Sequence, residues 1–285
     1  MNSELPSTVA QSLGPAAEKL ADTVRHVVDL VAGSDRIIAK AQAQAHAELI
    51  LAEGRAQKQD IEARAIDRLR KREARRQNNI ESITVKALKA LPPPEQLSEQ
   101  PVSEDWTSRF FEECQDISDV EMQQIWARIL AGEVARPGSF APHTLSVVRD
   151  LTKNDANLFT KVCGYVWRIT DTETMPVIHS IEMPEFVNTD IDFGSLTHLT
   201  TIGLIEYDHI AGYEIKKPAT EIAVSYFGAV HQLKSDGGQE RRLSLGHVIF
   251  TAVGNELLGI SGAQKNDEYC RATLNTWSKA GWKEA

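Results

Sequence analysis

Apolar residues near the N-terminus recur at alternating spacings of four and three, at Leu13, Ala17, Leu20, Val24, Val27 and Val31. Read as heptad positions, they form a coiled-coil seam, which requires a partner helix. An amphipathic helix docked on its own domain is the alternative. The polar face mixes both signs of charge, which disfavours a membrane-surface helix. We predict an amphipathic helix within residues 1–34, with these six positions as the candidate oligomerisation seam.

A second, longer helix is predicted for residues 35–91, where there is no proline and only Gly54 weakens the helical pattern. Its alanine-rich start permits close contact between helices, and its charged middle is typical of an exposed stalk. Apolar spacing resumes at Ile80, Ile83, Ala87 and Leu91, which we expect to pack on the following domain. Three prolines end the helix and open a linker at residues 92–104.

Short helices with clear boundary signals predict a compact helical domain at residues 105–170. Its first helix has a bulky apolar face formed by Trp106, Phe110 and Phe111, which we assign to the core. Two capping boxes mark the starts of later helices, Ser118 with Glu121 and Thr152 with Asp155.

The pattern changes to α+β at residues 171–285. A helix over 193–203 is followed by two strand-like runs, 223–233 and 243–252, which flank a glycine-containing turn at 235–239 and predict a hairpin. We predict two further helices, one at 251–258 and a final amphipathic one at 266–279. This order is typical of winged-helix modules. The expected fold is therefore mainly α with a smaller α+β part: a long N-terminal helix or coiled-coil stalk, a compact helical domain and a winged-helix-like C-terminal region.

Charge changes this picture in one place. The net charge of −9 argues against general attraction to phosphate backbones. Residues 55–76, however, contain nine basic residues and four acidic ones. They form either a solvated stalk with Glu–Arg pairs or a polyanion-binding stripe. The candidate polyanion-binding residues are Arg64, Arg68, Arg70, Lys71, Arg72, Arg75 and Arg76.

No recognisable catalytic set accompanies these elements. The eight histidines lack metal-ligand spacing, and no glycine-rich phosphate loop follows a strand, so we predict neither a metal nor a cofactor. An acidic cluster, Glu182, Glu185, Asp190 and Asp192, is either a solvated loop face or a nuclease centre. Arg128, Glu133 and His143 form a candidate polar site. The simpler interpretation is that an Arg128–Glu133 ion pair fixes the turn at Gly138.

The cysteine usage and the N-terminus indicate a location. Three distant cysteines suggest no disulfide framework, and the first residues lack the basic and apolar regions of a signal peptide. No apolar stretch approaches the roughly 18 residues of a membrane span. We therefore expect a cytoplasmic protein.

Three motifs carry a family resemblance: residues 77–81 (QNNIE), Asp105 with Trp106, and residues 126–133 (WARILAGE). Over about residues 36–159 the chain resembles an uncharacterised bacterial family known only as domain of unknown function 2806. The resemblance implies a bacterial origin and an alanine- and charge-rich helix before a Trp-containing domain. It also implies a link to immunity against phage. His143 stands where the family pattern has arginine, which counts against anion binding at that position.

Three functional hypotheses follow. The first is a non-enzymatic, oligomerising interaction protein of bacteria, in anti-phage defence, that senses or recruits a protein partner through its C-terminal domain. The alternative is a winged-helix-type regulator that binds nucleic acid. Its weakness is the predicted helix at 193–203, which contains no arginine or lysine to contact phosphates. The third is an infection-triggered enzyme or a membrane-acting effector.

Overall fold

The computed structural model describes residues 55–169, 173–186 and 189–285. The chain divides into two compact units, Met1–Arg149 and Asp150–Ala285. This division falls inside the range 105–170, which the sequence predicts as one helical domain. The predicted N-terminal helix with its seam, and the first part of the predicted long helix, lie outside the described residues.

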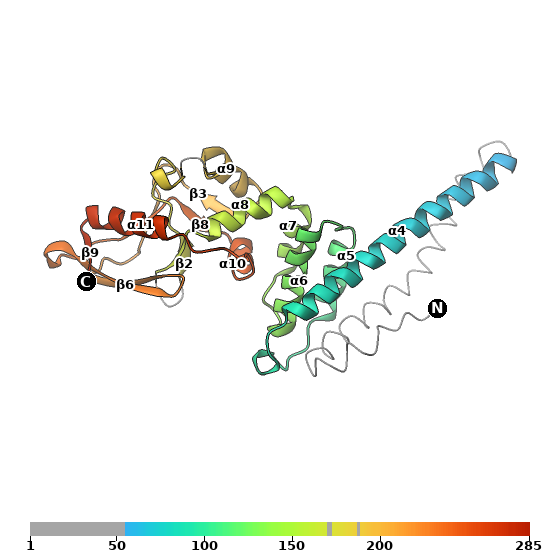
Figure 1. Ribbon diagram of the computed structural model, residues 1–285, viewed down its shortest axis with the longest axis horizontal. Helices are drawn as coiled ribbons and strands as arrows, with labels where there is room; N and C mark the ends of the chain where they lie inside the picture. Colours follow the sequence, from blue (N-terminus) through green and yellow to red (C-terminus); the bar gives the residue numbers. More distant parts are fainter. Residues whose placement is uncertain (1–54, 170–172, 187–188) are drawn as a thin grey trace. The chain divides into compact units, whose positions relative to one another are not determined.

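The described part of the first unit consists of helices α4 (Arg55–Ala90), α5 (Glu104–Cys114), α6 (Val120–Ala135) and α7 (Pro142–Asp150), with a short 3-10 turn η1 (Pro94–Gln96). Figure 1 shows α4 extending well beyond the helices that pack against it. The second half of α4 is anchored, because Ile80, Ile83 and Ala87 are buried against α6. This confirms the predicted packing for these three residues, whereas Leu91, the fourth predicted position, is half-buried and follows the end of the helix.

The core of this unit is aromatic and aliphatic. Trp106, Phe110 and Phe111 of α5 are buried as predicted, and the Phe110 ring meets Trp126 of α6 edge to face at 5.3 Å. One predicted cap is wrong: Asp119, and not Ser118, caps α6 by accepting the backbone N–H groups of residues 121 and 122. The neighbouring carboxylate is an equally good cap and is one residue closer to those amides.

The second unit begins with α8 (Lys153–Cys163), whose predicted capping box between Thr152 and Asp155 is confirmed. A five-stranded antiparallel sheet follows the order β2 (Thr174–Pro176), β1 (Val166–Arg168), β5 (Glu221–Tyr226), β6 (Ala229–Ser235), β9 (Trp282–Glu284). Two further ladders pair β3 (Ile205–Tyr207) with β8 (Val248–Phe250), and β4 (Tyr213–Glu214) with β7 (Ser244–Gly246).

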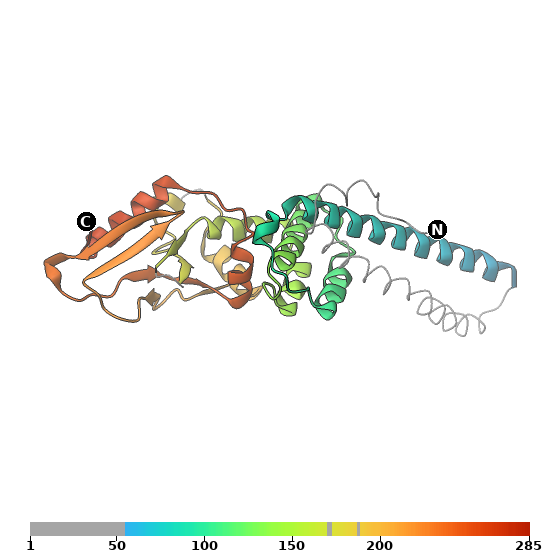
Figure 2. The same cartoon turned by 90° about the horizontal axis from the view of Figure 1, so that it is seen from below.

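Helices and two 3-10 turns complete this unit: η2 (Pro184–Phe186), α9 (Phe193–Thr201), η3 (Asp236–Gly238), α10 (Ala252–Leu258) and α11 (Asp267–Lys279). Helix α11, predicted as the final amphipathic helix, lies along the sheet (Figure 2). Its Trp277 meets Trp167 of β1 at 4.9 Å, and its buried Tyr269 accepts a hydrogen bond from the Trp167 indole. The core of the unit lies between this helix and the sheet.

The predicted hairpin is misplaced. The hairpin joins β5 to β6 through a turn at Phe227 and Gly228, and not at 235–239. The sequence pattern predicts one strand over 223–233. Gly228, within this run, adopts a positive φ of 86°, which permits the chain to reverse direction there. The coarse prediction of a mainly α protein with an α+β part is confirmed. The predicted stalk and winged helix remain predictions.

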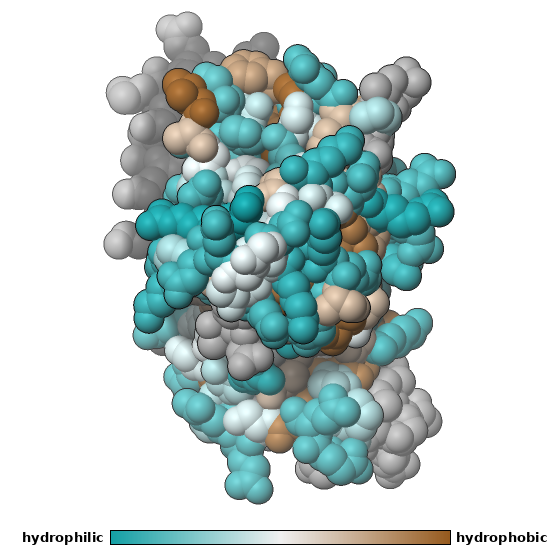
Figure 3. Space-filling model, turned by 90° about the vertical axis from the view of Figure 1, so that its left-hand side faces the viewer, coloured by the Kyte–Doolittle hydropathy of each residue, from teal (hydrophilic) through white to brown (hydrophobic). Residues whose placement is uncertain are grey.

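The surface adds two observations. The face seen in Figure 3 is mainly hydrophilic, with small separate hydrophobic areas. None of the helices in the described part of the chain combines the length and hydrophobicity that a bilayer span requires.

Candidate functional site

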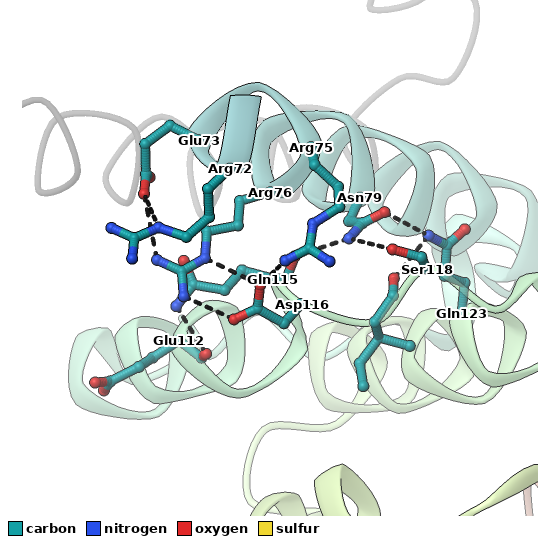
Figure 4. Close-up of polar contacts among 11 residues, drawn as sticks. Arg72, Glu73, Arg75, Arg76, Asn79, Glu112, Gln115, Asp116, Ser118 and Gln123 are labelled. Atoms are coloured by element: carbon teal, nitrogen blue, oxygen red, sulfur yellow. Dashed lines mark hydrogen bonds and ion pairs between the residues drawn. The ribbon is translucent and has the colours of Figure 1, made fainter. Parts of the chain in front are cut away.

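The basic end of the exposed part of α4 is tied to the loop after α5 (Figure 4). Arg76 binds Asp116 through two hydrogen bonds, from Nε to Oδ1 at 3.1 Å and from Nη2 to Oδ2 at 2.7 Å. Arg75 adds a third, from Nη2 to Oδ1 at 2.8 Å. The hydrogen bond from Arg76 and its positive charge hold the pKa of Asp116 below its usual range. Two of the seven candidate polyanion-binding residues, Arg75 and Arg76, are therefore paired with Asp116.

A buried amide network continues this contact along α4. Asn79 donates to the backbone oxygen of Gln115 at 2.9 Å and to Ser118 Oγ at 3.1 Å. The Gln123 amide of α6 donates to Asn79 Oδ1 at 3.2 Å, and its oxygen accepts from Ser82 at 2.8 Å. Because Asn79 and Gln123 are both buried, these bonds fix the register between α4 and α6.

The other candidate polyanion-binding residues, Arg64, Arg68, Arg70, Lys71 and Arg72, are exposed. Lys71 pairs with Asp67 at 2.8 Å and Arg72 with Glu73 at 3.0 Å. Arg64, Arg68, Lys71, Arg72 and Arg75 follow the spacing i, i+4, i+7, i+8, i+11, so they lie on one side of the helix. Arg70 lies on another side. We call these five residues the basic face of α4.

Glu133 of the candidate polar site binds the backbone of the turn that follows α6. Its buried carboxylate accepts the backbone N–H of Gly138 at 2.6 Å and that of Phe140 at 3.0 Å. His143 is exposed on α7, and Arg128 is half-buried on α6. Trp106 also donates from its indole to the Phe140 oxygen at 2.7 Å. Glu133 therefore anchors the turn between α6 and α7.

Three histidines that are far apart in sequence line one pocket of the second unit. The pocket, of about 160 Å³, is lined by His179, His209, His247, Tyr207, Glu182, Ser180 and two isoleucines. His179 follows β2, His209 follows β3, and His247 separates β7 from β8. Backbone contacts gather them: His247 donates its N–H to the oxygen of Ile178 at 2.9 Å, and Asp208 donates to the oxygen of His247 at 2.9 Å.

Close strand packing makes this arrangement depend on Gly246. This residue has a φ of 83°, and a Cβ atom there would lie 2.2 Å from the oxygen of Ile178. Only glycine combines this conformation with so close an approach. Gly246 therefore lets the strand that carries His247 lie directly against the segment that carries His179.

The pocket histidines have different electrostatic surroundings. Burial, and secondly the charge of His247, lower the pKa of His179 to about 4, so its imidazole is neutral at neutral pH. Its Nε2 is buried and has no hydrogen-bond partner among the described residues. His247 Nδ1 lies 2.6 Å from the oxygen of Asp208. A carbonyl only accepts, so Nδ1 carries the proton, and in the neutral ring Nε2 retains its lone pair.

One family profile, described as "Protein of unknown function (DUF2806)", matches residues 63–274. The chain belongs to this family. The match begins later than the resemblance read from the sequence and extends through most of the second unit. No curated protein and no solved structure matches the chain.

The motifs that carry the family resemblance coincide with structural contacts of the first unit. Asn79 lies in the buried network, Trp106 and Glu133 hold the turn at residues 136–140, and Gly132 packs against Phe140. A Cβ at Gly132 would lie 2.8 Å from the Phe140 ring. In the DUF2806 chain these motifs therefore stabilise the packing of α4, α5 and α6.

Other candidate chemistry is dispersed. In the acidic cluster, Asp190 pairs with Lys161, Asp192 caps α9, and Glu182 lines the pocket. The three cysteines are buried and unpaired, and burial raises the pKa of Cys163 to about 12. Within the described residues, no group of three or more His, Cys, Asp or Glu could hold a metal ion. The histidine pocket had no signal in sequence spacing, because strand pairing alone creates it.

Proposed function

We propose that this DUF2806 protein is a non-enzymatic interaction protein, which assembles with copies of itself through its N-terminal helices and recruits a protein partner through its C-terminal unit. We place it in the cytoplasm and in defence against phage, as its family resemblance suggested. The observation that supports assembly is that residues 61–78 of α4 are not buried.

No residue between Ile61 and Asn78 is buried. These positions span about 27 Å of helix at about 1.5 Å per residue. A helical segment of that length is marginal in water unless one face is packed. Ile61 is 39% and Ile66 is 42% exposed, and Leu69 is half-buried, so an apolar strip is available on this segment. We infer that the strip contacts helices of a second copy.

Two features favour a second copy as the occupant. The 54 residues before α4 include the heptad seam at 13–31, which is long enough to supply a partner helix. Charge is also complementary. Residues 55–76 carry a surplus of five positive charges, so the remainder of the chain carries −14 against −9 for the whole. Like chains can therefore attract each other through unlike segments.

The experiment is light scattering of the full chain after size exclusion. We expect a defined oligomer, and a lower mass for the chain without residues 1–33. The double variant Ile61→Asp with Ile66→Asp should also lower the mass. Val85→Asp is the matched control, because Val85 is 45% exposed on the same helix but beyond the strip. A monomeric full chain would refute the proposal, as would equal effects of the strip variant and the control.

The basic face of α4 favours a second candidate, the winged-helix-type regulator that binds nucleic acid. A regular row of cations along one side of a helix suits a phosphate backbone. Filter binding of duplex DNA at low and moderate salt tests this. Arg68→Glu with Arg72→Glu should abolish retention, whereas Arg70→Glu, outside the basic face, should reduce it less. Absence of retention at low salt would reject this function.

A further inference from the structure

The histidine pocket has the chemistry of a cation site. We infer that it binds the head group of a small organic cation, an alkylammonium or a guanidinium, supplied either by a free amine or by a peptide side chain. This goes beyond the proposed assembly function and does not depend on it.

The pocket lining contains one carboxylate and several hydrogen-bond acceptors. Glu182 is the one charged residue among its lining residues apart from the histidines, and no lysine or arginine lines it. His247 offers Nε2 as an acceptor when neutral. A ligand that donates hydrogen bonds and carries positive charge complements these groups.

Two rings of an aromatic cluster, those of Tyr207 and His209, line the pocket. Phe193 of α9 lies 5.9 Å from the Tyr207 ring and 5.5 Å from the His209 ring, centroid to centroid. Phe193 is 51% exposed, and nearby in sequence Ile210 is 82% exposed. Exposed aromatic rings attract ammonium and guanidinium groups through their negative faces, within about 6 Å of the ring centre. Tyr207 and His209 of this cluster line the same pocket as Glu182, and Phe193 contacts both rings.

The size limits the ligand. A volume of about 160 Å³ corresponds to about five water molecules, at about 30 Å³ for each in the liquid. Pockets for drug-sized ligands are larger, about 300–1,000 Å³. The pocket is therefore of a size that suits a head group of a few heavy atoms.

Calorimetric titration of the full chain tests the inference with ethylguanidinium and butylammonium, and with acetate as the anionic control. We expect saturable binding of both cations and none of acetate. Glu182→Gln should weaken cation binding about fivefold, the factor for one exposed ion pair. Glu240→Gln is the matched control, because Glu240 is an exposed glutamate of the same unit that does not line the pocket.

Imidazole NMR localises the binding. Resonances of His179 and His247 should shift with added cation, while that of His143 in the first unit should not. A capped Gly-Arg-Gly peptide that binds at least about tenfold more tightly than ethylguanidinium identifies a peptide side chain as the source. Equal or weaker peptide binding identifies a free amine. No saturable cation binding, equal binding of acetate, or equal effects of the two glutamate variants would overturn the inference.

Discussion

Glu133 provides the sharpest test of the first unit, because the sequence allowed it a functional role and the structure gives it an anchoring one. We consider Glu133→Ala, which removes the acceptors of two backbone N–H groups. Phe140 is buried, so its amide loses a charge-assisted bond without replacement, about 2 kcal/mol. Gly138 is exposed, so water can hydrate its amide and the loss is about 1 kcal/mol.

The expected loss in the free energy of unfolding is thus about 3 kcal/mol, which lowers the urea midpoint by about 1.5 M at a slope of about 2 kcal/mol/M. Glu133→Gln keeps one acceptor oxygen and should lose about half as much. Glu112→Gln, an exposed glutamate on α5, is the control and should change the midpoint little.

Urea unfolding followed by circular dichroism measures these differences, and hydrogen exchange reports the local effect. Both Glu133 variants should accelerate exchange in the segment 136–140. If Glu133→Ala unfolds at the same urea concentration as Glu112→Gln and exchange at 136–140 is unchanged, the carboxylate does not anchor the turn.

Three further outcomes follow from the contacts. Asp116→Asn should lower the free energy of unfolding by at most about 1 kcal/mol at neutral pH, because the pair with Arg76 is half exposed. Since the folded-state pKa of Asp116 is lowered, the stability that this pair gives the wild type should be lost as the pH falls through that pKa. Urea unfolding at a series of pH values should show this loss in the wild type and not in the variant. His179 has a folded-state pKa of about 4, below its unfolded value, so its contribution to the free energy of unfolding should be fully present above about pH 6.5. The free energy of unfolding should fall by about 2 kcal/mol between pH 7 and pH 5. His179→Gln should remove this pH dependence. Gly246→Ala should lower the free energy of unfolding of the second unit by more than about 2 kcal/mol, because the alanine Cβ would collide with the oxygen of Ile178. Urea unfolding measures this loss, and an unchanged midpoint would contradict the close packing.

Local sequence determined the features that depend on a few neighbouring residues. The capping box at Thr152 and Asp155, the end of the long helix before Pro92 and the extent of α11 were predictable, because each depends on backbone hydrogen bonds made within one turn. The resemblance motifs likewise identified the family. Local signals gave a wrong prediction where two neighbouring residues can both cap a helix, as Ser118 and Asp119 can at the start of α6.

Tertiary structure decided the features that join distant residues. Arg76 and Asp116 are 40 residues apart, and the pocket joins three histidines from separate strand ends. Their proximity follows from helix packing and strand register. Both depend on the free energy of the whole folded unit, so no spacing in the sequence predicts them. The sequence by itself therefore determined several helix boundaries and which family the chain joins. Only the folded chain decided which charges are neutralised and which histidines share a pocket.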